Sequence, residues 1–324
     1  MDIAGYFASL SPLKLLGNLP GGVAQGVIWG IMALGVYITF RLLDFADLSV
    51  DGTFATGGAV TVMLILAGAP AWLAILIAVL AGIVAGMVTG LLHTMLGIPA
   101  ILAGILTQFA LYSVNLHIMG MSANKAVSVD KYNLVITSRT IPNAIVVGLI
   151  FAAILIAVMY WYFGTEQGSA IRATGSNAAM SKAQGININT MKVIALALSN
   201  GVVALSGGLM AQYQGFADVG MGRGAIVIGL AAVIIGEVLG DAIFRKRMNF
   251  ALRLSMVVVG GIVYYAIVVV VLWLHLNSND LKLFTAVIVA IFLAAPYLKG
   301  KHRNSFTRIA KQNQKVEQGG TQDA

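Results

Sequence analysis

Residues 168–188, GSAIRATGSNAAMSKAQGINI, form a polar, glycine-punctuated segment between two long apolar stretches. The alanines favour helix, Gly175 and Gly185 can end a helix, and Ser176 or Asn177 can cap the next one. The sequence therefore predicts two short helices joined near Gly175. On physical grounds, such a segment is either a solvated connector or a compact docking surface that passes force from a partner protein.

The composition around this segment is that of a membrane protein. Of the 324 residues, 10% are charged and 59% are apolar, and the mean hydropathy is +0.91. A soluble domain has about 25% charged residues, so lipid is the expected surroundings of most of this surface. Because the chain has no cysteine, disulfides and thiolate metal sites are excluded.

About nine apolar segments (eight to ten) are long enough to be membrane spans, and they predict an all-α transmembrane bundle. The short segment near 224–240 contains Glu237, so we expect it to be tilted, broken or partly re-entrant. Residues 1–298 would form this transmembrane domain, with a polar loop at 165–189, and the basic, polar tail 299–324 would be disordered. The expected spans lie near 21–40, 50–67, 71–93, 99–119, 142–163, 191–212, 224–240, 251–274 and 283–298, with Pro20, Pro70, Pro99, Pro142 and Pro296 at or near their ends.

The net charge of +8 predicts the orientation of the chain rather than binding to nucleic acid. About 14 of the basic residues fall in one set of connections, which includes 164–190, 241–250 and the C-terminal tail, and that set is expected to be cytoplasmic. The C-terminus would then lie inside, the N-terminus outside and the 168–188 segment inside. The basic segments, 245–253 and the tail after Leu298, contain only two aromatic residues, Phe250 and Phe306, which disfavours nucleic acid as a partner.

Two features inside the apolar segments have candidate roles. Glycines at four-residue spacing place a small residue on one helix face, which favours close helix packing in lipid. Uncharged polar groups must be satisfied within the membrane, either by interhelical hydrogen bonds or because they line a translocation path. The packing candidates are Gly22, Gly26, Gly30, Gly82, Gly86 and Gly90. The path candidates are the uncharged Thr53, Gln108, Asn115, Asn200 and Gln212, together with the acidic Asp51.

The sequence carries no motif of an enzyme. It lacks a GxxxxGK[ST] phosphate loop, an HExxH zinc motif and a GxSxG nucleophile, and GMGRG (220–224) resembles a phosphate loop only in composition. The spans also lack the buried acidic relay or arginine ladder that ion-driven carriers and voltage sensors need. A transporter built this way would take its energy from another protein, and no cofactor or metal site is expected in this chain.

Residues 168–215 resemble the coupling-helix region of ABC importer permeases of the branched-chain amino acid and ribose type. In that family a G…RA.G.N..AA…GIN pattern precedes a span rich in small residues. This sequence differs from the family pattern at residues 179–182, which are Ala-Met-Ser-Lys. The positions that match are Gly168, Arg172, Ala173, Gly175, Asn177, Ala178, Gly185, Ile186 and Asn187.

A second stretch, residues 26–60, resembles the first spans of the same family. The family's NFAH stretch corresponds to Asp44-Phe45-Ala46-Asp47, with Asp in place of Asn, and LSVDGTF (48–54) looks like a subgroup linked to aromatic amino acid uptake. Two interpretations of Asp44, Asp47 and Asp51 stay open. They form a hydrated acidic loop that caps the second span, or they belong to a broken helix whose end faces the pathway.

The resemblance implies a permease in the bacterial cytoplasmic membrane that imports a small polar solute, with an amino acid favoured over a monosaccharide or nucleoside. Two permease copies, as a homodimer, would pair in the membrane above two ATP-binding cassette subunits, which bind ATP and Mg²⁺. A solute-binding protein would deliver the ligand from outside. A stand-alone channel or secondary carrier is the alternative class.

Overall fold

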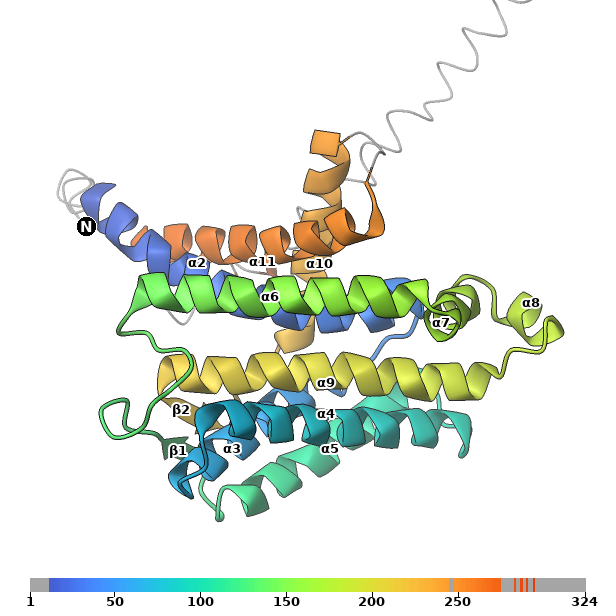
Figure 1. Ribbon diagram of the computed structural model, residues 1–324, viewed down its shortest axis with the longest axis horizontal. Coiled ribbons are helices and arrows are strands. Elements are labelled where there is room, and N and C mark those ends of the chain that lie inside the picture. The colour runs from blue at the N-terminus through green and yellow to red at the C-terminus, as the bar shows by residue number, and fades with distance from the viewer. Residues whose placement is uncertain are drawn as a thin grey trace, which may run out of the picture. The chain divides into compact units, whose positions relative to one another are not determined.

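The computed structural model describes residues 12–244 and 248–274, together with five single residues between 283 and 294. In this part of the chain the structure is helical apart from one two-stranded ribbon, as the sequence predicts (Figure 1). Seven of the described helices are long and apolar enough to cross a membrane. The ninth predicted segment, apart from those single residues, and the tail 299–324 lie outside the described residues.

The helices follow the predicted segments closely. The long ones are α2 (Pro12–Tyr37), which continues into a π-helical turn η1 (Ile38–Leu42), α4 (Ala71–Thr94), α5 (Ala100–Ile118), α6 (Ile141–Gly164), α9 (Ile188–Gln214), α10 (Ala225–Phe244) and α11 (Phe250–Trp273). Shorter helices are α3 (Val50–Leu66), α7 (Glu166–Ser176) and α8 (Ala178–Ala183), and strand β1 (Asn124–Ala126) pairs antiparallel with β2 (Phe216–Asp218).

Proline marks the start of three helices. Pro70 and Pro99 directly precede α4 and α5, and Pro142 is the second residue of α6. A proline suits these positions because its missing N–H group has no intrahelical partner there. Pro20 differs, since α2 begins at Pro12 and runs through it. The predicted start was too late because apolar residues on both sides of this proline support one continuous helix.

Helix α9 packs against α2, α3 and α4, and small residues let these neighbours approach it closely. A side-chain carbon at Gly35 of α2 would lie 2.8 Å from the carbonyl oxygen of Ser199. The Ser199 hydroxyl in turn donates a 2.7 Å hydrogen bond to the Gly35 carbonyl, and Ser206 donates one of 2.7 Å to Ile28. Both hydroxyls are thus satisfied inside the bundle, as a membrane interior requires.

The two glycine ladders face different helices. Gly22, Gly26 and Gly30 lie against α11, and a Cβ at Gly26 would stand 2.7 Å from the Cα of Ile262. Gly82, Gly86 and Gly90 lie against α9, and a Cβ at Gly86 would stand 2.2 Å from the Leu196 carbonyl oxygen. At both contacts a methyl group would collide with main chain.

Helix α3 begins inside the bundle rather than at its edge. After η1 the chain turns back at Asp44, whose φ is +54°, and the side chain of Asp47 then meets Asn200 in the middle of α9. The 17 residues of α3 extend about 25 Å, which is less than the ~30 Å of a bilayer core. The interpretation of a broken helix therefore fits this position. The segment near 224–240, which was expected to be tilted, broken or partly re-entrant, instead forms the unbroken 20-residue helix α10.

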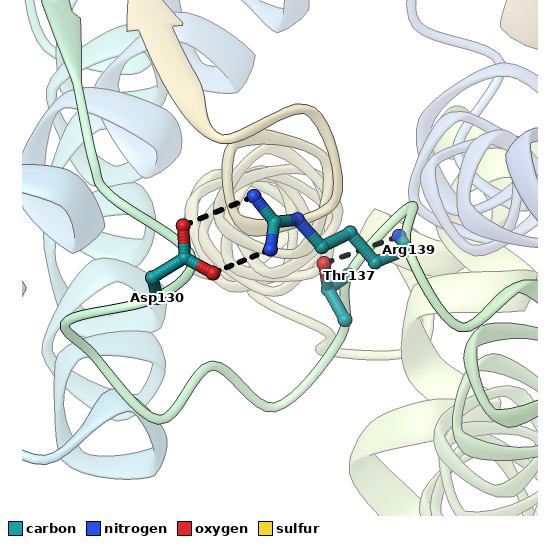
Figure 2. Close-up of polar contacts among 3 residues, drawn as sticks. All are labelled: Asp130, Thr137 and Arg139. Carbon is teal, nitrogen blue, oxygen red and sulfur yellow. Dashed lines mark hydrogen bonds and ion pairs between the residues drawn. The ribbon is translucent and has the colours of Figure 1, made fainter.

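The β ribbon joins two connections at the end of the bundle opposite to α7 and α8. The connection from α5 to α6 contains β1, and the connection from α9 to α10 contains β2. Figure 2 shows the exposed Asp130–Arg139 ion pair that closes the first of these loops, where the Thr137 hydroxyl also accepts the Arg139 backbone N–H. The ribbon and the α7–α8 loop are therefore separated by the full length of α6 and α9 (Figure 1).

Candidate functional site

A cavity of about 400 Å³ lies where α3, α5 and the turn before α10 meet. Three of the six predicted path residues line it, namely Asp51, Gln108 and Asn115. We call this space the α3–α5 cavity. The rest of its wall is formed by Gly52, Phe109, Tyr112, Val219 and Arg223.

Asp51 joins two helix N-termini. It lies in the first turn of α3, and its two carboxylate oxygens accept hydrogen bonds of 2.9 Å from the backbone N–H groups of Gly224 and Ile226, at the start of α10. These amides belong to the unpaired donors that every helix start presents. A Cβ at Gly222 would stand 1.9 Å from the Asp51 carbonyl oxygen, so glycine is required for the turn to pack this closely. The GMGRG segment therefore forms one wall of the cavity.

Asn115 forms the inner side of the cavity. Its side chain is fully buried, and its Nδ2 donates a 3.4 Å hydrogen bond to the Gly52 carbonyl. Its Oδ1 has no hydrogen-bond partner within the described part of the chain. A buried acceptor without a partner costs about 1–3 kcal/mol, so this oxygen is suited to receive a donor from a ligand.

A second polar group, the Asp47 cluster of Asp47, Ser49 and Asn200, lies deeper in the bundle. Asp47 Oδ1 accepts from the Ser49 N–H at 2.9 Å and from the Ser49 hydroxyl at 2.6 Å. Asp47 Oδ2 accepts from Asn200 Nδ2 at 2.8 Å. Thr53, another predicted path residue, bonds to the Ser49 carbonyl at 3.1 Å. These contacts tie the start of α3 to the middle of α9.

The acidic residues of this region have three different environments. Asp44 is exposed, Asp51 is half-buried and Asp47 is only 1% exposed. The interpretation of a hydrated acidic loop is therefore wrong for Asp47. Three hydrogen-bond donors replace the water that this carboxylate loses on burial, and sequence patterning could not reveal them because Asn200 is 153 residues away.

Gln212 lies apart from both polar groups. Its Oε1 accepts a 2.8 Å hydrogen bond from the Val135 N–H, and its Nε2 lies 3.5 Å from the Ala71 carbonyl. This side chain thus links the end of α9 to the loop before α6 and to the start of α4. The structure does not place it in the α3–α5 cavity.

The loop 165–189, here called the coupling loop, forms the two predicted short helices. The Asn177 side chain accepts from the Met180 N–H at 3.0 Å and caps α8, and Gly185 ends it with a φ of +85°. The following span is capped by Asn187, whose side chain accepts from the Thr190 N–H at 3.2 Å. The sequence had favoured Ser176 equally for the first cap.

Gly175 has a different role from the one predicted. It stays helical inside α7 and does not end that helix in a left-handed conformation. A Cβ here would stand 2.0 Å from the Leu42 carbonyl oxygen, so the glycine lets α7 pack directly on the end of η1. This contact joins residues 133 positions apart, and the local pattern gave no sign of it.

The matched positions of the coupling loop divide into an inner and an outer set. Gly168 is buried, and Gly175 and Ile186 are half-buried. Arg172 is exposed, and its guanidinium lies 5.9 Å from the ring of Phe250 in α11. The remaining matched positions are exposed at the free surface of α7 and α8: Ala173, Asn177, Ala178, Gly185 and Asn187.

Comparison with known proteins agrees with this architecture. Residues 18–296 match the family model described as the permease component of the branched-chain amino acid transport system. The chain belongs to this permease family.

Two relatives are similar to the permease over large parts of its length. The tyrosine transport system permease protein of Clostridioides difficile (strain R20291) is 38% identical over 296 residues, which cover 91% of this chain and 97% of the relative. An uncharacterized protein of Rickettsia prowazekii (strain Madrid E) is 32% identical over 180 residues, or 56% of this chain and 62% of the relative. No solved structure matches the permease.

Sequence reasoning missed several residues of the permease that the structure brings into the α3–α5 cavity. Arg223 belongs to the GMGRG segment, whose glycines were noticed only for their composition. Phe109 and Tyr112 lie on the same span as the predicted path residues Gln108 and Asn115, but they were not among the candidates. Their spacing with Gln108 and Asn115 on one helix, at intervals of three and four residues, is the signal that could have grouped them.

Proposed function

We infer that the permease is the membrane subunit of an ATP-driven importer and that its cargo is an amino acid, with tyrosine or another aromatic amino acid as the first candidate. The observation that carries this proposal is the family match over 18–296, together with a relative named for tyrosine transport that covers 91% of the chain. The LSVDGTF segment, at the start of α3, supports the aromatic cargo.

Energy would enter through the coupling loop. Its outer surface carries small and polar side chains, among them Ala178 and Asn187, which allow close approach of a partner. The loop runs directly into α9, and Asn200 of α9 holds Asp47 beside the start of α3. Movement imposed on α7 and α8 would therefore reach the α3–α5 cavity through one rigid helix.

The proposed assembly contains two copies of the permease, two ATP-binding cassette subunits under the coupling loops and an external solute-binding protein. ATP and Mg²⁺ would be bound by the cassette subunits, since the sequence of the permease has no phosphate-binding loop. Selection of the cargo would be shared with the binding protein.

Reconstitution tests the proposal. The permease is co-expressed with the cassette ATPase and binding protein encoded beside it, purified, and placed in proteoliposomes with ATP on the cytoplasmic side. We expect co-purification of the ATPase and ATP-dependent uptake of labelled L-tyrosine or L-phenylalanine. Uptake of a monosaccharide or nucleoside alone would refute the cargo, and ATP-independent transport without a bound ATPase would point to a channel or secondary carrier.

A further inference from the structure

We propose that the α3–α5 cavity is a binding site for a free, zwitterionic amino acid with an aromatic side chain, held by its ammonium group at Asp51 and by its carboxylate at Arg223. The inference rests on the proposed import function and extends it, because it assigns recognition of the cargo to the permease itself. It starts from three kinds of side chain, acidic, basic and aromatic, that line one cavity.

The ammonium end is set by Asp51 and Asn115. Asp51 forms no ion pair within the described residues, and its hydrogen bonds come from two backbone N–H groups. Asn115 presents a buried Oδ1 that lacks a donor. Both residues line the cavity, and a carboxylate and an amide oxygen are acceptors for the N–H groups of an ammonium.

The carboxylate end cannot lie at the start of α10, although a helix N-terminus attracts anions. Asp51 already occupies that position, with its oxygens on the Gly224 and Ile226 amides. The carboxylate of a ligand at the same position would be repelled by the negative charge of Asp51. The cation that remains is Arg223, which lines the cavity, is exposed and makes no ion pair in the described part of the chain. A guanidinium can bind a carboxylate through two parallel hydrogen bonds.

The side chain of the ligand is matched by Phe109 and Tyr112. Both are on α5, both line the cavity, and they are 72% and 45% exposed despite their aromatic rings. Aromatic pairs gain about 0.5–1.5 kcal/mol beyond burial of their area. The volume of about 400 Å³ falls in the range of roughly 300–1,000 Å³ usual for small-molecule sites. A ligand with one aromatic ring, one ammonium and one carboxylate therefore matches the residues that line the cavity.

Binding of three probes to the purified permease, with any bound ATPase, in lipid nanodiscs tests the assignment. The probes are L-phenylalanine, 2-phenylethylamine, which lacks the carboxylate, and 3-phenylpropanoate, which lacks the ammonium. Ligand-observed NMR gives each dissociation constant. We expect each analogue to bind about ten- to a hundredfold more weakly than L-phenylalanine, since each loses a charge-assisted contact.

The variants assign each end of the ligand. Arg223→Gln should weaken the binding of L-phenylalanine by a similar factor and leave the affinity for 2-phenylethylamine unchanged. Asp51→Asn should weaken the binding of L-phenylalanine and leave the affinity for 3-phenylpropanoate unchanged. Arg139→Gln is the matched control. This arginine is paired with Asp130 (Figure 2) and does not line the cavity, so the change should leave the affinity for all three probes unchanged.

Equal weakening of all three probes by both variants would overturn the assignment, because it indicates a structural effect. Equal affinity of the three probes for the unmodified permease would overturn it too, and that result holds even if Asp51→Asn does not fold. ATP-dependent uptake of L-phenylalanine without this pattern of binding would remove the site and leave the import function standing. Failure of an ATPase to co-purify would instead count against the import function.

Discussion

Asp47 is a buried carboxylate that forms no ion pair within the described residues. The sequence placed it in a loop, where a charge is normally hydrated. Its three donors come from Ser49, which is local, and from Asn200 on another helix. Loss of the Asn200 donor would leave one oxygen of this buried carboxylate without its hydrogen bond.

The variant Asn200→Ala tests this dependence. We expect it to lower the free energy of unfolding by about 1.5–3 kcal/mol, the range for hydrogen bonds to charged groups. In an Asp47→Asn background the same change should cost less, because the partner is no longer ionised, and a double-mutant cycle isolates the difference. Denaturant unfolding in detergent measures it, with the exposed Asn189→Ala as control. Equal costs in both backgrounds would show that Asn200 acts through packing and not through Asp47.

Helices α7 and α8 have an inner face that packs on the bundle and an outer face that is exposed. The inner face holds the loop to the bundle, as Gly175 packs on Leu42 and Gly168 on Phe163. On the outer face the side chains of Ala178 and Met180 are exposed, and Met180 is 59% exposed. Substitutions on the two faces should therefore fail in different ways.

Gly175→Ala and Ala178→Trp form the pair that separates these faces. The methyl group of Gly175→Ala would collide with the Leu42 carbonyl. This variant should therefore lower the free energy of unfolding by about 1–3 kcal/mol, the usual cost of overpacking. The second should leave stability within about 0.5 kcal/mol of the unmodified protein and abolish co-purification of the ATPase. Retention of the ATPase by Ala178→Trp would place docking elsewhere.

The contact of α4 with α9 tolerates no side chain at Gly86, where a Cβ would stand 2.2 Å from main chain. Gly86→Ala should cost about 1–3 kcal/mol of unfolding free energy. Gly164→Ala is the matched control, since that glycine is helical, exposed and has nothing within 4 Å of its added Cβ. Alanine there should change stability by no more than about 1 kcal/mol, and in the stabilising direction. Unfolding in detergent compares the two, and a neutral Gly86→Ala would show that the helices can separate without loss.

For the whole molecule, the sequence predicted the elements better than the contacts between them. Apolar length and proline position are properties of the chain itself. Eight of the nine predicted segments are therefore helices within the described residues, and seven of these are long enough to span a membrane. The Asp47 cluster and the α3–α5 cavity depend on contacts between residues 63 to 175 positions apart, such as Asn115 with Gly52 and Asp51 with Ile226. Local patterns contain no such information. Asp51, Gln108 and Asn115 were predicted as polar groups inside spans, and only the fold brings them together.

The arrangement of the two ends is also a property of the whole molecule, because α6 and α9 place the coupling loop opposite to the β ribbon. The excess of basic residues predicts that the coupling loop is cytoplasmic and that the ribbon faces outside.

Single cysteines test this orientation, and the chain suits the method because it has no cysteine of its own. Ala178→Cys marks the coupling loop and Lys125→Cys marks β1. Both positions should be sufficiently accessible, since Ala178 is exposed and Lys125 is half-buried. A membrane-impermeant maleimide should label Lys125→Cys in intact spheroplasts and Ala178→Cys only in inside-out vesicles, with the exposed Asp130→Cys as a second external marker. Labelling of Ala178→Cys from outside would reverse the orientation, and with it the access of a cytoplasmic ATPase to α7 and α8.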